Sequence, residues 1–411
     1  MSRLKNKFTT LWASVSTGIF LIGYNVGTGS ITAMASAGSD YGMSLSWALV
    51  LSCIFAYFML IEFSKYTLCT GQSSMYAFRQ HFGSPVTIFI MVSLLSAEVC
   101  SSMGLMGISA EVVKEWSRPL TSDGQGFSPV VVSLIFAALL GFVCWTGEQN
   151  YFEKILAVFV ALMGIAFIAT MFVVIPSAET IIKGLKPSMP DGNNSFVVVA
   201  SVVGTTMGAI LYVARSVMVK EKGWTFDDMK AQKKDALVSV AMMFILSFAV
   251  MACAAGAMRG EHIDNAIQMV GLVEPLAGKA ATSLFVAGIV SAALSSLFPI
   301  LLLAPWLISD FKGEKQNLKS PRSRILIYGV LLISLIVPLF GWKPVKVVLI
   351  SQTLTMVATP LVVLFMALLL NRPALMGAHR ARWWENLLLS LVFIFTLYVA
   401  VNGIWGLFVM D

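Results

Sequence analysis

Apolar stretches of about 20 residues recur along almost the whole chain, from Thr10 to Met410, with short polar segments between them. A helix of about 20 residues is long enough to cross the hydrocarbon core of a bilayer. The composition agrees, because 58% of the residues are hydrophobic and only 12% are charged, whereas soluble domains carry about 25% charged residues. The sequence therefore predicts an all-α polytopic membrane protein that is embedded in a lipid bilayer.

We expect eleven transmembrane helices in a single domain over residues 1–411, because the longest predicted loops, of about 20 residues, leave no room for a soluble domain. The helices are predicted near residues 10–37, 44–68, 84–113, 128–146, 152–176, 195–220, 235–258, 280–309, 323–341, 345–370 and 384–409.

The basic residues predict the orientation of the chain in the membrane. With a cytoplasmic N-terminus, nineteen of the 28 Lys and Arg residues lie inside and eight outside, and Arg215 lies within a helix. Segments on the cytoplasmic side of membrane proteins are enriched in Lys and Arg. We therefore expect a multi-pass protein of the plasma (inner) membrane, with the N-terminus in the cytoplasm and the C-terminus outside. Nucleic acid is not an expected partner, since the basic residues form no patch interleaved with aromatic residues.

Glycine-rich stretches interrupt two predicted helices near their middle, at residues 23–30 of helix one and residues 204–209 of helix six. Each glycine weakens a helix by about 1 kcal/mol relative to alanine, and backbone groups freed inside a bilayer survive only where they face packed protein or a cavity. Broken helices at corresponding places in two halves are typical of transporters with a site near the membrane midplane. The alternative is close helix packing, which small residues also permit.

Residues at the two breaks are the predicted substrate-binding residues. They are Asn25, Gly27, Thr28, Ser30, Thr205, Thr206 and Gly208.

Charged side chains inside a membrane are costly, so those in or next to the helices are candidates for gating or coupling. They are Glu98, Arg215, Glu221 and Asp235. Glu98 is expected either to attract a cation or carry a proton, or else to form a structural ion pair with Arg215. Glu221 and Asp235 either pair across the inner mouth or belong to solvated loops. A further acid, Glu62, is expected to pair with Lys65 as that lysine extends toward the membrane surface.

A series of short motifs in collinear order resembles the NRAMP (natural resistance-associated macrophage protein) family of divalent metal transporters. The motifs occupy residues 40–42, 45–52, 70–72, 78–82, 97–98 and 183–190, together with Ser351-Gln352 and Pro360. The resemblance implies the amino acid-polyamine-cation superfamily fold, with an inverted five-plus-five repeat. Repeat one is expected at about residues 10–176, repeat two at about 195–370 and an extra helix at about 384–409. It also implies Gln352 as a substrate-binding residue.

The family's own metal-binding motifs are missing. Its Asp-Pro-Gly-Asn motif falls on residues 27–30 and keeps only Gly29, and its Met-Pro-His motif falls on residues 208–210. Its second helix-six histidine falls on Arg215, and the second acid of helix three on Leu105. The loss of the imidazole and the helix-one carboxylate argues against proton coupling.

Hydroxyl, carbonyl and amide groups remain around the breaks, and these suit a hydrated divalent ion such as magnesium better than dehydrated manganese or iron. The sequence therefore predicts a transporter of divalent metal cations that works by alternating access. The alternatives are a carrier of a small organic solute such as an amino acid, and a relative that transports nothing. No cofactor and no enzymatic activity are expected, because no nucleophile, base and orienting group cluster in the sequence.

Overall fold

The computed structural model describes residues 28–146, 149–190, 194–260 and 274–409, together with Ile263 and Gln268, and all its regular elements in these ranges are helical. The α-helices are α2 (Thr28–Tyr41), α3 (Ser46–Thr70), α4 (Ser74–Phe82), α5 (Ser84–Ser117), α6 (Pro129–Thr146), α7 (Gln149–Val174), α8 (Ala178–Gly184), α9 (Ser195–Met207), α10 (Ala209–Glu221), α11 (Met229–Ala257), α12 (Glu274–Lys312), α13 (Pro321–Ser334), α14 (Ile336–Phe340), α15 (Pro344–Leu370), α16 (Pro373–Met376) and α17 (Trp383–Val409).

Local sequence signals set several helix ends. At the end of α3, Gly71 adopts the left-handed conformation with φ 66°, which glycine reaches without a steric penalty. At the start of α13, the hydroxyl of Ser320 accepts the backbone N–H of Ser323 at 3.2 Å, as an N-cap does. α15 begins at Pro344, at a position where a helix needs no amide donor. These signals fix where the apolar stretches begin and end as helices.

Nine helical stretches of the described residues are long and apolar enough to cross a membrane, and the bent pair Val160–Val174 and Ala178–Gly184 makes up to ten. The first predicted helix is represented by α2, and its earlier residues lie outside the described ranges. The predicted polytopic all-α fold is confirmed, whereas the boundaries of the two repeats remain a prediction.

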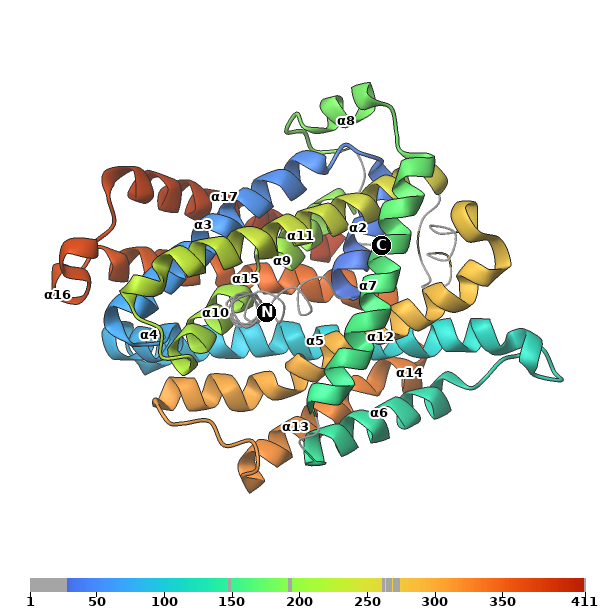
Figure 1. Cartoon of the computed structure of the whole chain (residues 1–411), viewed down its shortest axis with the longest axis horizontal. Helices are drawn as coiled ribbons and strands as arrows, with labels where there is room; N and C mark the ends of the chain where they lie inside the picture. The colour runs from blue at the N-terminus through green and yellow to red at the C-terminus, as the bar shows by residue number, and fades with distance from the viewer. Residues whose placement is uncertain are drawn as a thin grey trace, which may run out of the picture.

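Burial separates central from peripheral helices. The stretch Ser195–Glu221, which joins α9 and α10, has 94% of its most apolar window buried, whereas for α17 the share is 33%. α15 packs on α5, α9 and α17, and α11 packs on α2 and α3. Figure 1 shows α3, α5, α11 and α15 lying roughly along the long axis of the molecule. The broken span six is therefore enclosed by other helices.

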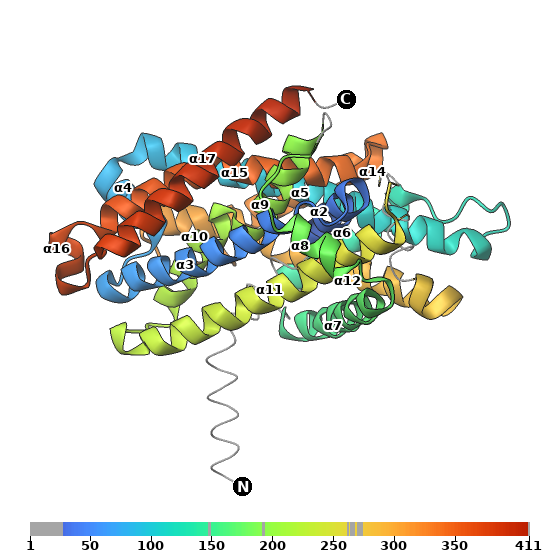
Figure 2. The ribbon, with the colours of Figure 1, turned by 90° about the horizontal axis from the view of Figure 1, so that it is seen from above.

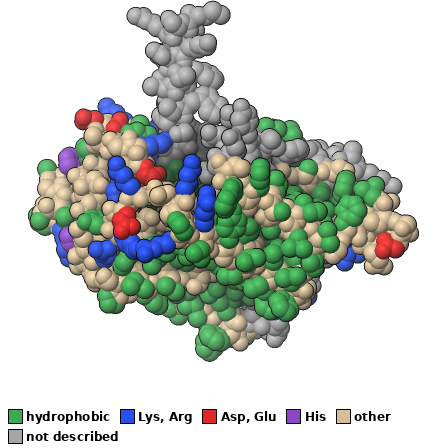
Figure 3. Space-filling model, turned by 90° about the horizontal axis from the view of Figure 1, so that it is seen from below, with side chains coloured by type: hydrophobic (Ala, Val, Ile, Leu, Met, Phe, Trp, Pro, Cys, Tyr) green, Lys and Arg blue, Asp and Glu red, His purple; other side chains and the backbone are tan. Residues whose placement is uncertain are grey.

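The two ends of the molecule differ in charge. α4 and α16 lie at one end, and the connection between α5 and α6 lies at the other (Figures 1 and 2). On the face drawn in Figure 3, most Lys and Arg side chains gather toward the end with α4 and α16, and the middle is largely hydrophobic. A hydrophobic middle with charged ends is the surface expected of a protein that sits in a bilayer.

Several local features differ from the sequence expectation, among them the short helices α8 and α16 in predicted loops. The predicted loop after α3 contains a short helix, α4, and the predicted helix over 323–341 is divided at Leu335 into α13 and α14. α4 is too short and too polar on one face to be recognised as a span. Leu335 keeps αR geometry, but its N–H bonds to Leu332, three residues back, at 3.2 Å, so the division is a local tightening of the helix.

Candidate functional site

Span six is broken at Gly208. This residue lies between α9 and α10 with φ −59° and ψ 142°, so the chain leaves the helical conformation for one residue and then resumes it. Cβ atoms have no room here: one built on Gly204 would overlap the carbonyl oxygen of Gln352, and one on Gly208 would lie 2.6 Å from the carbonyl oxygen of Gly204. The interruption predicted within residues 204–209 is confirmed.

The break predicted in helix one falls largely outside the described residues. Asn25 and Gly27 belong to that part of the chain, so their roles remain a prediction. Thr28, Gly29 and Ser30 are described, and they form the first turn of α2. Gly29 faces α15, because a Cβ atom built on it would lie 2.9 Å from Nε2 of Gln352. The described start of α2 therefore lies against α15, as Gly204 of span six does.

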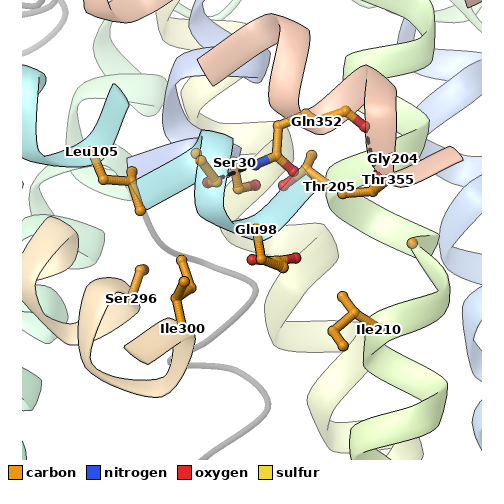
Figure 4. A pocket seen from close by; sticks show the side chains of 13 residues that line it. Ser30, Glu98, Leu105, Gly204, Thr205, Ile210, Ser296, Ile300, Gln352 and Thr355 are labelled. Atoms are coloured by element: carbon orange, nitrogen blue, oxygen red, sulfur yellow. Dashed lines mark hydrogen bonds between the residues drawn. The ribbon is translucent and has the colours of Figure 1, made fainter. Parts of the chain in front are cut away.

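A pocket lies where α2, α5, α9, α10, α12 and α15 meet, with an empty volume of about 420 Å³ that includes open space at its mouth. Figure 4 shows its side chains converging from these helices. The lining residues are Gly29, Ser30, Glu98, Ser101, Leu105, Gly204, Thr205, Gly208, Ile210, Ser296, Ile300, Gln352 and Thr355. The broken span thus borders a polar cavity.

Five of the predicted site residues line this pocket: Ser30, Glu98, Thr205, Gly208 and Gln352. Two others have their hydroxyl groups engaged elsewhere. Thr28 donates to the carbonyl oxygen of Ile289 at 3.2 Å, and Thr206 donates to that of Val202 at 2.7 Å. Neither of these two threonines is among the lining residues, so only some of the hydroxyl groups near the breaks line the pocket.

Three polar lining residues were not predicted: Ser101, Ser296 and Thr355. Ser101 follows Glu98 by three residues and Thr355 follows Gln352 by three, so helical periodicity places each pair on one face. That spacing was a usable signal. Ser296 has no comparable sequence signal, because it is one of several serines in α12.

The pocket offers mainly neutral oxygen groups. The side-chain amide of Gln352 donates to Oγ of Ser101 at 3.4 Å, and the hydroxyl of Thr355 donates to the carbonyl oxygen of Gln352 at 2.6 Å. Glu98, 7% exposed, is the one charged side chain among the described residues that line the pocket. No group of three or more His, Cys, Asp or Glu residues suited to hold a metal occurs in the described part of the chain. The described lining therefore offers one carboxylate together with several neutral oxygen groups.

Arg215 forms a buried polar cluster whose members are not among the residues that line the pocket. Its guanidinium is fully buried and pairs with the carboxylate of Asp235. It also donates to Oε1 of Gln232 at 2.5 Å and to Oγ of Ser64 at 3.2 Å. The cluster joins α3, α10 and α11.

Of the alternatives left open by the sequence, the ion pairs of Glu98 with Arg215 and of Glu221 with Asp235 are therefore wrong. Within the described ranges no ion pair joins Arg215 to Glu98, because Arg215 faces α3 and α11 whereas Glu98 lies on α5. Asp235 does not pair with Glu221, because its carboxylate is buried against Arg215 while Glu221 lies at the exposed end of α10.

Lys65 pairs with Glu62 at 3.3 Å, as predicted, and also with Glu385 of α17 at 2.8 Å. The lysine does not extend to the surface, because its side chain is only 10% exposed. Glu385 also accepts the backbone N–H of Arg382 at 2.7 Å. These bonds fix the first turn of α17 to α3.

A second network joins α4, α10 and α12 at the end of the molecule rich in basic residues. Nζ of Lys220 lies 3.8 Å from Oδ1 of Asp310 and donates to Oγ of Ser73 at 3.1 Å. Ser73 in turn donates to Asp310. The backbone N–H of Ser74 donates to Oγ of Ser216 at 3.1 Å. We call Ser73, Ser74, Ser216, Lys220 and Asp310 the α4 clamp.

The far end of α4 is held by α16 and its flanking residues. Nη1 of Arg372 lies 2.8 Å from Nδ1 of His81. Burial, and then the neighbouring Arg372 charge, lower the pKa of His81 from its ordinary value of 6.5. The imidazole is thereby held neutral at pH 7, so that Nδ1 accepts a hydrogen bond from Arg372.

Comparisons with solved structures agree with this fold. The manganese transporter of Eremococcus coleocola, in complex with an aromatic bis-isothiourea substituted compound, superimposes with a TM-score of 0.75 at 13% identity, covering 98% of this chain and 88% of that one. A nucleobase-cation-symport-1 family transporter in a closed conformation superimposes with a TM-score of 0.61 at 16% identity, covering 96% and 90%.

Sequence comparisons give relatives over nearly the full length. The chain is 22% identical to the divalent metal cation transporter MntH of Mycobacterium tuberculosis, over 92% of this chain and 89% of the relative. It is 24% identical to the protein of the same name from Klebsiella pneumoniae, over 93% and 90%. The model of the Nramp family, described as natural resistance-associated macrophage protein-like, matches residues 18–406. The chain therefore belongs to the Nramp family.

Proposed function

We propose that this chain moves divalent metal cations across a membrane by alternating access, through the pocket at the break of span six. The observation that carries the proposal is the position of Glu98. Among the described residues it is the only charged side chain that lines the pocket, and the remaining polar groups there come from Ser, Thr, Gln and backbone. One carboxylate among neutral oxygen groups attracts a cation without stripping its water. The two MntH relatives, whose names state divalent metal cation transport, support this substrate class.

We further propose that the preferred ion is magnesium or a similarly hydrated cation rather than manganese or iron. Magnesium gives up its waters reluctantly and keeps an octahedral shell. The described lining residues include no thioether, thiolate or imidazole group, and these are the groups that favour transition metals.

A carrier of amino acids is the weaker candidate. Such a carrier would present the N-terminus of a half-helix to the carboxylate of its substrate. In this chain the backbone N–H of Ala209, the first residue of α10, already donates to Oγ1 of Thr359 at 3.1 Å. Glu98 would also repel a carboxylate placed in the pocket.

The proposed topology places the N-terminus and the α4 clamp on the cytoplasmic side of the inner membrane. Its support is the excess of Lys and Arg in the segments on that side. We propose that opening toward the cytoplasm separates α10 from α4 and α12, which breaks the α4 clamp. In this scheme Arg215 and Asp235 move together with α3, and Glu221 lies at the mouth next to Lys220.

The test is uptake of Mg²⁺ and of Mn²⁺ by proteoliposomes that contain the full chain. We expect saturable Mg²⁺ uptake with weaker Mn²⁺ uptake, and no change in the internal pH as the cation enters. Glu98→Gln should raise the Mg²⁺ concentration for half-maximal uptake roughly tenfold, the usual loss when a hydrogen bond to a charged group is removed. The control Glu179→Gln removes an exposed carboxylate in α8, whose side chain is 75% exposed, and should behave like the parent. No uptake of either ion would refute the proposal, and Mn²⁺ uptake alone would refute the selectivity.

A further inference from the structure

The break in span six needs partners for the backbone groups that it frees. In a continuous helix the N–H groups of Ala209 and Leu211 would bond to the carbonyl oxygens of Thr205 and Met207. Here the N–H of Leu211 bonds to the carbonyl oxygen of Gly208 at 3.1 Å, and that of Ala209 bonds to Oγ1 of Thr359 at 3.1 Å. The carbonyl groups of Thr205 and Met207, at the end of α9, therefore lose the N–H donors that a continuous helix would give them.

Thr359 is well placed to keep this arrangement. It lies on α15 and is fully buried. Its hydroxyl donates to the carbonyl oxygen of Thr355 at 2.8 Å, which leaves a lone pair to accept the N–H of Ala209. The next residue is Pro360, inside the helix, and proline supplies no backbone N–H to the carbonyl group four residues earlier. α15 therefore lacks one backbone hydrogen bond next to the residue that contacts the break.

The same stretch of α15 contacts the other walls of the pocket. Thr355 and Gln352 line it. The side chain of Gln352 bonds to Ser101 of α5 at 3.4 Å and faces Gly29 of α2. The hydrogen bond between Thr359 and Ala209 adds the start of α10 to these contacts. One face of α15 thus contacts α2, α5 and both halves of span six, and so fixes their positions relative to one another.

We propose that Thr359 is a positioning residue: its hydroxyl holds span six open at Gly208 and so sets the polar wall that the transported cation meets. Thr359 is outside the pocket lining, so it acts through Ala209 and not by touching the ion. The inference rests on the proposed function for its link to transport, but the geometry of the break can be tested without any flux.

The substitution Thr359→Val removes the hydroxyl and keeps the side-chain shape. The matched control is Thr396→Val in α17, which is also fully buried but donates only to carbonyl groups of its own helix, at 2.9 and 3.0 Å. Thr359→Ser keeps the hydroxyl and should restore the parent behaviour. Thr359→Ala replaces the valine variant if that protein does not fold.

The first measurement is hydrogen–deuterium exchange of the segment 205–212 in the full chain reconstituted in nanodiscs. We expect exchange to be roughly fivefold faster in Thr359→Val, because one amide loses its acceptor, and unchanged in Thr396→Val and Thr359→Ser. The second is Mg²⁺ uptake, in which Thr359→Val should raise the half-maximal concentration roughly fivefold with little change in the maximal rate.

The outcomes separate the two proposals. If the parent takes up no divalent cation, the proposed function falls, and exchange in the segment 205–212 alone decides the role of Thr359. Parent-like exchange in Thr359→Val overturns the positioning role. If the parent does transport, an equal rise in half-maximal concentration in Thr359→Val and Thr396→Val also overturns it, because the effect would then be a general loss of packing.

Discussion

At the scale of single residues, the close contact between Gly204 and α15 leaves no room for a side chain at position 204. A Cβ atom at this position would overlap the carbonyl oxygen of Gln352, a backbone atom that cannot move aside alone. We expect Gly204→Ala to destabilise the protein by about 1–3 kcal/mol, the usual cost of overpacking. Gly329→Ala is the matched control, because nothing lies within 4 Å of a Cβ atom there. Denaturation in mixed micelles measures both, and equal stability of the two variants would contradict the contact.

The sequence predicted Glu98 because a charged side chain inside a membrane is costly, and Gln352 through the resemblance to the family. Glu98 and Gln352 were expected, and their helical neighbours Ser101 and Thr355 could have been found from the spacing of three residues. The partner of Arg215 could not be found in this way. A buried guanidinium needs a carboxylate, but whether that carboxylate comes from α5 or α11 depends on which face of α10 turns inward, and periodicity within an apolar helix does not reveal that.

At the scale of elements, the Arg215 cluster makes α3, α10 and α11 one unit. Arg215 and Asp235 are almost completely buried, so removing one partner leaves an uncompensated charge. We expect Arg215→Met to cost about 3–5 kcal/mol, and the double variant with Asp235→Leu to cost clearly less. A double-mutant cycle from denaturation in mixed micelles measures this coupling.

The exposed pair of Lys183 and Glu179, whose side chains are each 75% exposed, is the control for that cycle. It should show a coupling of under about 1 kcal/mol. Additive costs for Arg215→Met and Asp235→Leu would show that the two side chains are not coupled in the folded protein.

Elements also show where sequence reasoning reaches its limit. Runs of about 20 apolar residues identify spans because the bilayer fixes their length, and repeated glycine identified the break in span six. The short helix α4 gave no such signal, although the α4 clamp depends on it. Its N-terminus is held by Ser216 and Asp310, residues far away in the sequence, so the contact arises only once α10 and α12 are packed.

At the scale of the whole molecule, function depends on whether the pocket between α2, α5, span six, α12 and α15 is the path of the ion. The most direct measurement is Mg²⁺ uptake before and after alkylation of a single cysteine at Ser101→Cys, in a chain whose five native cysteines are replaced by serine or alanine. Ser109→Cys is the control, because Ser109 lies on the same helix, is buried, and is not among the residues that line the pocket. We expect alkylation at Ser101→Cys to stop uptake and Mg²⁺ to slow the alkylation, with neither effect at Ser109→Cys. Mg²⁺ uptake that persists after complete alkylation of Ser101→Cys would contradict the account.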